Sequence, residues 1–178
     1  MIRSNPQGDF PKIDKAAYID PLAVVIGKVK IGKNVYVAPG AVIRADEHNS
    51  SITIGNNCNV QDRAIIHALG NSNVWIGPDT SLSHGCIVHG PCRIGRGCFI
   101  GFGSVIFKAT LYDSVFVKFS AVVSGVVIPA QRVIDDGVVI DGAEKTRNLA
   151  LVSKESREFM KNVLKANTEL VQGYKKSV

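Results

Sequence analysis

The sequence has 178 residues, of which 46% are hydrophobic, so it can bury the core of one domain without disulfides or structural metals. Its formal net charge of +6 would suit an anionic partner, but many C-terminal basic residues alternate with acids and no RNA-binding motif or zinc finger is present, so we expect no nucleic-acid partner. No apolar run approaches the roughly 18 residues of a membrane span, and the four cysteines form no C-x-x-C pair, so we expect a cytoplasmic protein with reduced thiols and no membrane contact.

Residues 1–17 are expected to form an N-terminal segment, and a six-residue repeat organises the chain that follows. Apolar residues recur at every sixth position, and glycine often comes next, as in Ile31-Gly32 and Ile94-Gly95. A helix would repeat at 3.6 and a plain strand at 2, so a period of six indicates a short strand followed by a tight turn. Three such units close one triangular coil, and coils stack about 4.8 Å apart. The repeat predicts an all-β solenoid over residues 18–141, with these apolar residues inside: Ile19, Val25, Ile31, Val37, Ile43, Ile54, Val60, Ile66, Ile76, Leu82, Val88, Ile94, Ile100 and Ile106.

The repeat is interrupted twice, between Ile43 and Ile54 and between Ile66 and Ile76. The intervening letters, EHNSS and ALGNSN, predict loops in place of regular turns. Loops on a rigid scaffold are common places for binding sites. We therefore expect the functional site near these two interruptions.

A C-terminal α-helix is predicted over residues 153–176, within the same domain. Its apolar residues recur at helical spacing, Ser153 is a plausible N-cap, and Glu155 lies in the first turn, where the helix dipole favours an acid. Asn167 interrupts the apolar stripe. We expect the helix to pack along the solenoid or against a neighbouring subunit.

Three of the four histidines are placed by the repeat in two columns. His67 and His89 each follow the inward residue of the same face in successive coils, so they should point outward with Cβ atoms about 5 Å apart. His84 lies in a different column, one coil after Asp62. In a homotrimer, His84 of one chain could meet His67 and His89 of another. Three neutral imidazoles and one open position suit a catalytic zinc ion, and Fe²⁺ or Co²⁺ would also fit.

Local motifs resemble the γ-class carbonic anhydrase family, in particular its methanogen-type members and the anhydrase-like domains of carboxysome scaffolds. The motifs are RADE at 44–47, NVQD at 59–62, HGCIVH at 84–89 and NTELVQGYK at 167–175. The resemblance implies a left-handed parallel β-helix of hexapeptide repeats with a C-terminal helix. It also implies reversible hydration of carbon dioxide to bicarbonate by a metal-bound hydroxide at a subunit interface.

The resemblance further assigns roles to individual residues. It makes His67, His84 and His89 the metal ligands, and Gln61 the residue that orients the hydroxide, with Asn59 supporting the pocket. Glu47 and Asn167 would lie near the open coordination position and handle the proton or bicarbonate. Interface ion pairs would be formed by Arg44, Asp46 and Asp62.

The sequence departs from the family pattern where the proton should leave. Gly70 stands where the methanogen-type enzymes carry a shuttle glutamate, and Lys165 replaces a tyrosine. Proton transfer would then fall to Glu47 or His48. Two alternatives stay open: a catalytically weak or inactive metal-binding scaffold, and a hexapeptide-repeat acyltransferase that uses one histidine as general base. We expect Trp75 and Phe107 at a subunit contact, and the cysteines in the core or its turns.

Overall fold

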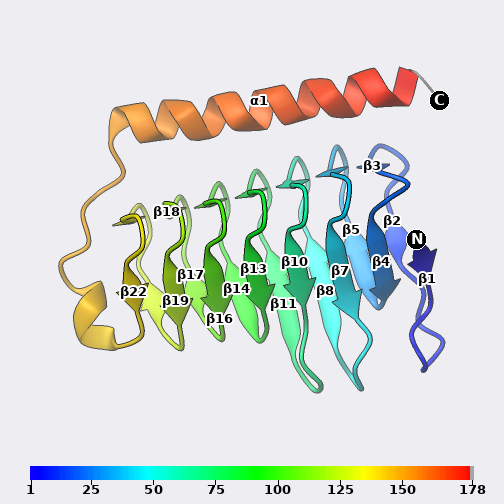
Figure 1. The fold of residues 1–178 in the computed structure, drawn as a ribbon, viewed down its shortest axis with the longest axis horizontal. Helices are drawn as coiled ribbons and strands as arrows, with labels where there is room; N and C mark the ends of the chain where they lie inside the picture. Colours follow the sequence, from blue (N-terminus) through cyan, green and yellow to red (C-terminus); the bar gives the residue numbers. More distant parts are fainter. Residues whose placement is uncertain (177–178) are drawn as a thin grey trace.

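The computed structural model describes residues 1–176 as a parallel β-solenoid of about seven turns, with one long helix lying along it (Figure 1). The fold class predicted from the repeat is confirmed. The solenoid has three faces, which we name sheets A, B and C. Sheet A contains, in spatial order, β1 (Ile2–Arg3), β4 (Val24–Gly27), β7 (Val42–Ala45), β10 (Ile65–His67), β13 (Ile87–His89), β16 (Val105–Phe107), β19 (Val122–Ser124) and β22 (Val139–Ile140).

Sheets B and C complete each coil. Sheet B contains β2 (Lys12–Ile13), β5 (Val29–Ile31), β8 (Ser51–Ile54), β11 (Asn73–Ile76), β14 (Cys92–Ile94), β17 (Thr110–Leu111) and β20 (Val127–Ile128). Sheet C contains β3 (Tyr18–Ile19), β6 (Tyr36–Val37), β9 (Asn59–Val60), β12 (Ser81–Leu82), β15 (Phe99–Ile100), β18 (Phe116–Val117) and β21 (Val133–Ile134). A short 3₁₀ helix, η1 (Ala143–Thr146), follows the last coil, and α1 (Lys154–Lys176) ends the described chain.

The core is the stack of inward residues that the six-residue period identifies. Ile66 pairs with Ile43 on one side and Val88 on the other, and all three side chains are fully buried. Burial of each such side chain contributes roughly 1.5–3 kcal/mol relative to exposure. Turns between faces place asparagine or aspartate in the left-handed region, as at Asn57 and Asp79, where these residues are tolerated best among non-glycines.

The solenoid begins earlier than residue 18. Strands β1 and β2 lie within the segment that we set apart as N-terminal, and they pair in parallel with β4 and β5. The repeat in fact extends back to Ile13, which lies one period before Ile19 and pairs with Ile31. The loop between β1 and β2 breaks the period before Ile13, so the repeat does not reveal β1.

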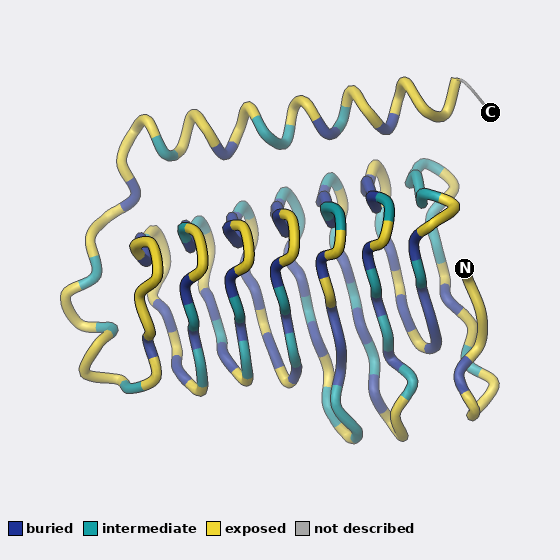
Figure 2. Tube along the Cα trace, viewed as in Figure 1, coloured by how far each residue is buried: buried dark blue, intermediate teal, exposed yellow. Residues whose placement is uncertain are grey.

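Helix α1 runs back along sheet C, from the last coils toward the first (Figure 1). Ser153 caps it as predicted, since its Oγ accepts a hydrogen bond from the Ser156 amide at 3.0 Å. At one end Phe159 packs against Phe99, with ring centroids 5.3 Å apart. At the other end Tyr174 stacks on Tyr18, with centroids 4.8 Å apart. The side of the helix that faces the solenoid carries its buried residues, and the opposite side is exposed (Figure 2).

All four cysteines are free and buried. Burial raises the pKa of the Cys58, Cys86 and Cys98 thiols to about 12 and also raises that of Cys92. The thiols are therefore protonated near neutral pH and act as small core residues. Within residues 1–176, no helix combines the length and apolar character needed to cross a membrane.

Candidate metal centre

The two interruptions of the repeat form long loops that lie next to each other at one corner of the solenoid, after β7 and after β10 (Figure 1). The Asn71 amide donates a hydrogen bond to the His48 carbonyl at 2.8 Å. The Gly70 amide donates to Glu47 Oε2 at 2.7 Å. The second loop therefore fixes the Glu47 side chain at the end of β7, beside the histidine column of sheet A.

His67 and His89 are stacked on the outside of sheet A, as predicted. They are direct partners in the pairing of β10 with β13. His67 Nδ1 lies 3.1 Å from His89 Nε2, and the two rings are inclined at 70°. Burial lowers the pKa of His67, and the positive charge of Arg44 and the neighbouring His89 lower it further, against the opposing effect of Glu47 and Asp46. The His67 imidazole is thus kept neutral near pH 7, the state in which it can bind a metal.

The second nitrogen of His67 faces a ring of charged groups. Its Nε2 lies 3.3 Å from Arg44 Nη2, 3.4 Å from Asp46 Oδ1 and 3.5 Å from Glu47 Oε1. Arg44 Nε in turn lies 3.7 Å from Asp46 Oδ2, so this predicted ion pair forms within one chain. Two buried polar atoms of the cluster, Asp46 Oδ1 and His89 Nδ1, have no hydrogen-bond partner among the described residues.

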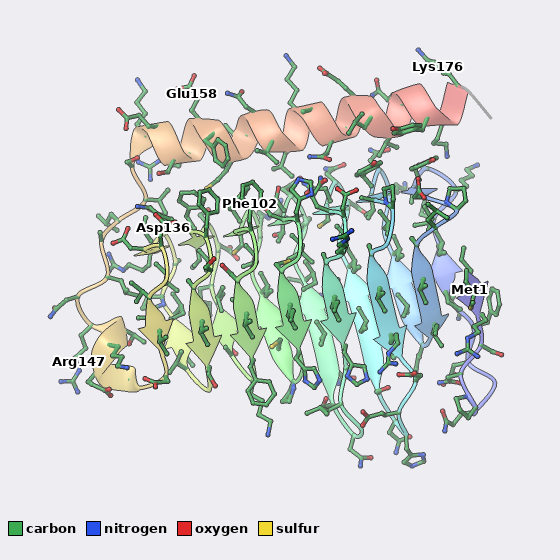
Figure 3. The ribbon with its side chains drawn as sticks, in the orientation of Figure 1. Met1, Phe102, Asp136, Arg147, Glu158 and Lys176 are labelled. Atoms are coloured by element: carbon green, nitrogen blue, oxygen red, sulfur yellow. The ribbon has the colours of Figure 1, made fainter. Side chains whose placement is uncertain are left out.

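His84 lies apart, at the corner where sheet C turns into sheet A. Its Nδ1 lies 2.8 Å from Asp62 Oδ2, and both side chains are about half exposed. Asp62 thus pairs with His84 within the chain. The ion pair between Asp62 and Arg44 was predicted across a subunit interface, and it stays a prediction. Phe102 continues the corner in the next coil, with its ring 5.4 Å from His84 and stacked on Phe119 at 4.6 Å; Figure 3 labels Phe102 near α1.

A third set of predicted residues forms a hydrogen-bonded chain from sheet C to α1. Gln61 Nε2 donates to Asn167 Oδ1 at 2.6 Å and approaches Asn59 Oδ1 at 3.2 Å. Asn59, fully buried, donates to Ser81 Oγ at 2.8 Å. The polar interruption of the helix stripe at Asn167 is therefore satisfied by Gln61. Beside it lies a cavity of about 340 Å³ whose lining includes Gln61, His84 and Asn167.

One chain does not assemble all three histidines. Within residues 1–176, no group of three or more His, Cys, Asp or Glu side chains is arranged to hold a metal ion. The stacked pair nevertheless fits a shared ion, because two nitrogens bound tetrahedrally at 2.0–2.1 Å would be about 3.3 Å apart, close to the 3.1 Å observed. The pair lacks a third ligand, and His84 lacks the other two.

Sequence reasoning missed a column of aliphatic side chains next to the histidine pair. Each residue precedes an inward residue of sheet A, points outward, and is only partly buried. The signal was present in the sequence, because an aliphatic residue directly precedes the inward residue of this face once in every coil. Strand pairing places the column in unbroken register: Val24, Val42, Ile65, Ile87, Val105, Val122 and Val139.

Comparison with known proteins shows the family and the fold of this chain. The family description "Bacterial transferase hexapeptide (six repeats)" matches residues 10–45 and 73–108. The carbonic anhydrase of Methanosarcina thermophila is 36% identical over 97% of this chain and 78% of its own length. The carboxysome assembly protein CcmM of a Nostoc species is 35% identical over 92% of this chain, which spans only 31% of that protein. A solved structure from Bacillus cereus, described as a candidate acetyltransferase, superposes with a TM-score of 0.86 over 99% of this chain and 98% of its own, at 24% identity.

The fold and the repeat thus define a hexapeptide-repeat β-solenoid protein. Within that class, the chain belongs to the γ-class carbonic anhydrase family. The likeness to the Bacillus structure supports the fold alone.

Proposed function

We propose that this protein is a metal-dependent carbonic anhydrase that reversibly hydrates carbon dioxide at a site shared between two copies of the chain. The observation that carries this proposal is the division of the histidines: a facing pair on sheet A, and His84 at the opposite corner. Each half is incomplete as a metal site, and each is the complement of the other. The family relationship to a carbonic anhydrase supports the reaction.

The outer surface of sheet A supports contact between copies. Its aliphatic column runs beside the histidine pair through seven strands, and Phe107 continues the histidine column, 5.6 Å from His89. At the corner that would meet it, Phe102 and Phe119 leave 43% and 37% of their surfaces exposed. Apolar surface of this extent is typical of interfaces. A heterologous contact of one corner with the next sheet A closes into a ring, and we propose a homotrimer.

Zinc, Fe²⁺ or Co²⁺ would be held by His67 and His89 of one chain and His84 of the next. Such an ion supplies a water of lowered pKa and a Lewis acid for carbon dioxide. Asp62 would keep the His84 proton on Nδ1, since it lies 2.8 Å from that atom, and so leave Nε2 free to bind the ion.

The remaining polar residues orient the reactants and remove the proton. Gln61 is held by Asn167 and Asn59, so its amide is fixed at the edge of the cavity that contains His84. Glu47 reaches from His67 toward the Gly70 amide, and its side chain is 45% exposed. This position lets Glu47 accept a proton at its carboxylate and release it to solvent, without a glutamate at position 70.

The proposal is tested by stopped-flow hydration of carbon dioxide with the full chain loaded with zinc, cobalt, or iron under anaerobic conditions. A rate above the buffer control for at least one metal is expected. Metal binding without turnover for all three would contradict it and favour a metal-binding scaffold. Protection of the protein by coenzyme A, without bound metal, would instead indicate an acyltransferase.

The subunit contact predicts a change of oligomeric state in an Ile87→Glu variant. A glutamate in the middle of the aliphatic column would place a charge in an apolar contact, so dissociation to monomers at micromolar concentration is expected. Light scattering after size exclusion measures this mass. The matched control is Thr53→Glu, because Thr53 occupies an outward position on sheet B. If the Ile87→Glu variant kept the trimer mass that is expected of the Thr53→Glu control, sheet A would not form the contact between copies.

The orienting role of Gln61 predicts the outcome of an Asn167→Leu substitution. Leucine fits the apolar stripe of α1 but removes the acceptor 2.6 Å from Gln61 Nε2. Loss of a hydrogen bond that holds a residue of the site in place typically costs about 10–100-fold in activity. We expect that fall in kcat/KM with no loss of thermal stability, measured by hydration assays and thermal unfolding. An Asn167→Asp variant retains the acceptor and should lose less.

A further inference from the structure

The outward face of sheet B carries basic side chains without acidic partners. Lys12, Lys30 and Arg93 share the outward column of this sheet, and Lys28 and Lys108 lie along its margin; all five are exposed. Among residues 1–176, none of the five takes part in an ion pair, whereas Arg96 and Lys118 are paired with aspartates. These five cations are therefore available to an external anion.

Two hollows on this face combine cations with an aromatic ring. The first, of about 490 Å³, is lined by Phe10 together with Lys12, Lys28 and Lys30. Asp9 is the one acidic residue in this lining, against three lysines, and its carboxylate accepts a hydrogen bond from the Asn5 amide at 3.2 Å. The second hollow, of about 540 Å³, has Trp75 and Pro91 in its lining, with Arg93 and Lys108. Each hollow can therefore take an acidic group together with an apolar side chain, which would contact Phe10 in the first hollow and Pro91 in the second.

The spacing of the hollows matches an extended polypeptide. Lys30 and Arg93 are separated by three strand steps, β5 to β8 to β11 to β14, which is about 14 Å at the spacing of paired strands. An extended chain advances about 3.3 Å per residue and covers this distance in about four residues. A segment with acidic groups at that interval would reach both hollows.

The chemistry of the face favours a polypeptide over a nucleic acid. The Arg93 guanidinium lies 4.1 Å from the centre of the Trp75 ring, so this ring is already covered and cannot stack on a base. The guanidinium itself remains suited to a carboxylate, which it can bind through two hydrogen bonds. Trp75 lies on sheet B, whereas Phe107 lies on sheet A, the face that the proposed function assigns to other copies.

We infer that sheet B is a docking face for an acidic, extended segment of a partner protein. Sheet C is covered by α1, and sheet A is the face that the proposed function assigns to other copies, so sheet B is the broad face left for a partner. Its five cations give charge complementarity to such a segment. The inference about sheet B depends on its own residues and not on the metal centre.

The test is binding of a fluorescein-labelled 12-residue peptide that carries two pairs of glutamates separated by two uncharged residues, one of them leucine, so that corresponding glutamates are four positions apart. Saturable binding in the micromolar range, weakened by salt, is expected from fluorescence anisotropy. Trp75 is the single tryptophan of the chain, so its emission should change at the same peptide concentration. Lys30→Glu and Arg93→Glu should each weaken binding about tenfold while thermal unfolding stays unchanged.

The matched control is Lys161→Glu, which changes the net charge equally on the exposed side of α1. Equal weakening by this control would show unspecific charge attraction and overturn the inference. So would binding no tighter than that of an uncharged peptide of equal length, or tighter binding of a single-stranded oligonucleotide or of phosphatidylserine vesicles. Metal content is measured on the same variants as well. It depends on the proposed metal centre and not on sheet B, so it tests the proposed function separately from the docking face.

Discussion

Mixing a His67→Ala/His89→Ala variant with a His84→Ala variant is expected to restore carbon dioxide hydration that neither shows alone. Each variant lacks part of every site, so each should hydrate at the rate of the buffer control and bind no metal. In a mixed trimer, one contact joins an intact His67 and His89 pair to an intact His84. Random exchange of equal amounts after partial unfolding and refolding should therefore recover about a quarter of the wild-type activity.

The mixing experiment separates a shared site from one contained in a single chain. If all three ligands came from one chain, no mixed trimer would contain an intact site and the mixture would stay inactive. Metal content, measured on the refolded trimers, should rise in parallel with activity. The control is His48→Ala, which removes the exposed loop histidine and should leave metal content unchanged.

A Leu82→Ala substitution should cause the largest loss of stability. Leu82 is fully buried among the inward residues, in the coil between Val60 and Ile100. Because neighbouring coils hold the backbone in place, the vacated space cannot close, and Leu→Ala changes in such cores cost about 3–5 kcal/mol. Urea unfolding at constant protein concentration measures the difference in free energy of unfolding.

Leu151→Ala provides the matched control, since the same atoms are removed from a side chain that is 64% exposed. Its effect should stay within about 0.5 kcal/mol. Similar losses for both variants would mean that the inward stack is not the source of stability. The comparison keeps residue type constant and changes only burial.

The sequence predicted the solenoid and the stacked pair of histidines because both depend on a local period. Once Ile66 and Val88 are assigned to the same face, His67 and His89 must be neighbours. The helix was equally visible in its apolar stripe. The start of the solenoid was not, since the loop before Ile13 breaks the period.

Contacts between elements far apart in the sequence were harder to predict. The bond between Gln61 and Asn167 joins residues 106 positions apart, and only the family resemblance suggested that they are close. The repeat placed Asp62 and His84 in one column, one coil apart, but their ion pair was not predicted, because Asp62 was assigned to a contact between subunits. The aliphatic column of sheet A was not predicted, because its residues point outward and the six-residue period marks the inward residues.

The attachment of α1 at both ends has a consequence for how this protein can change over evolution. Phe159 is anchored on the later coils and Tyr174 on the earliest, with Asn167 between them against Gln61. One coil occupies about 4.8 Å, and a helix rises 1.5 Å per residue, so about three helical residues span one coil. The length of the helix between its two anchors therefore matches a fixed number of coils. Duplication or loss of a coil between these anchors would be tolerated only with a matching change of about one helical turn, which restricts the length variation open to this solenoid.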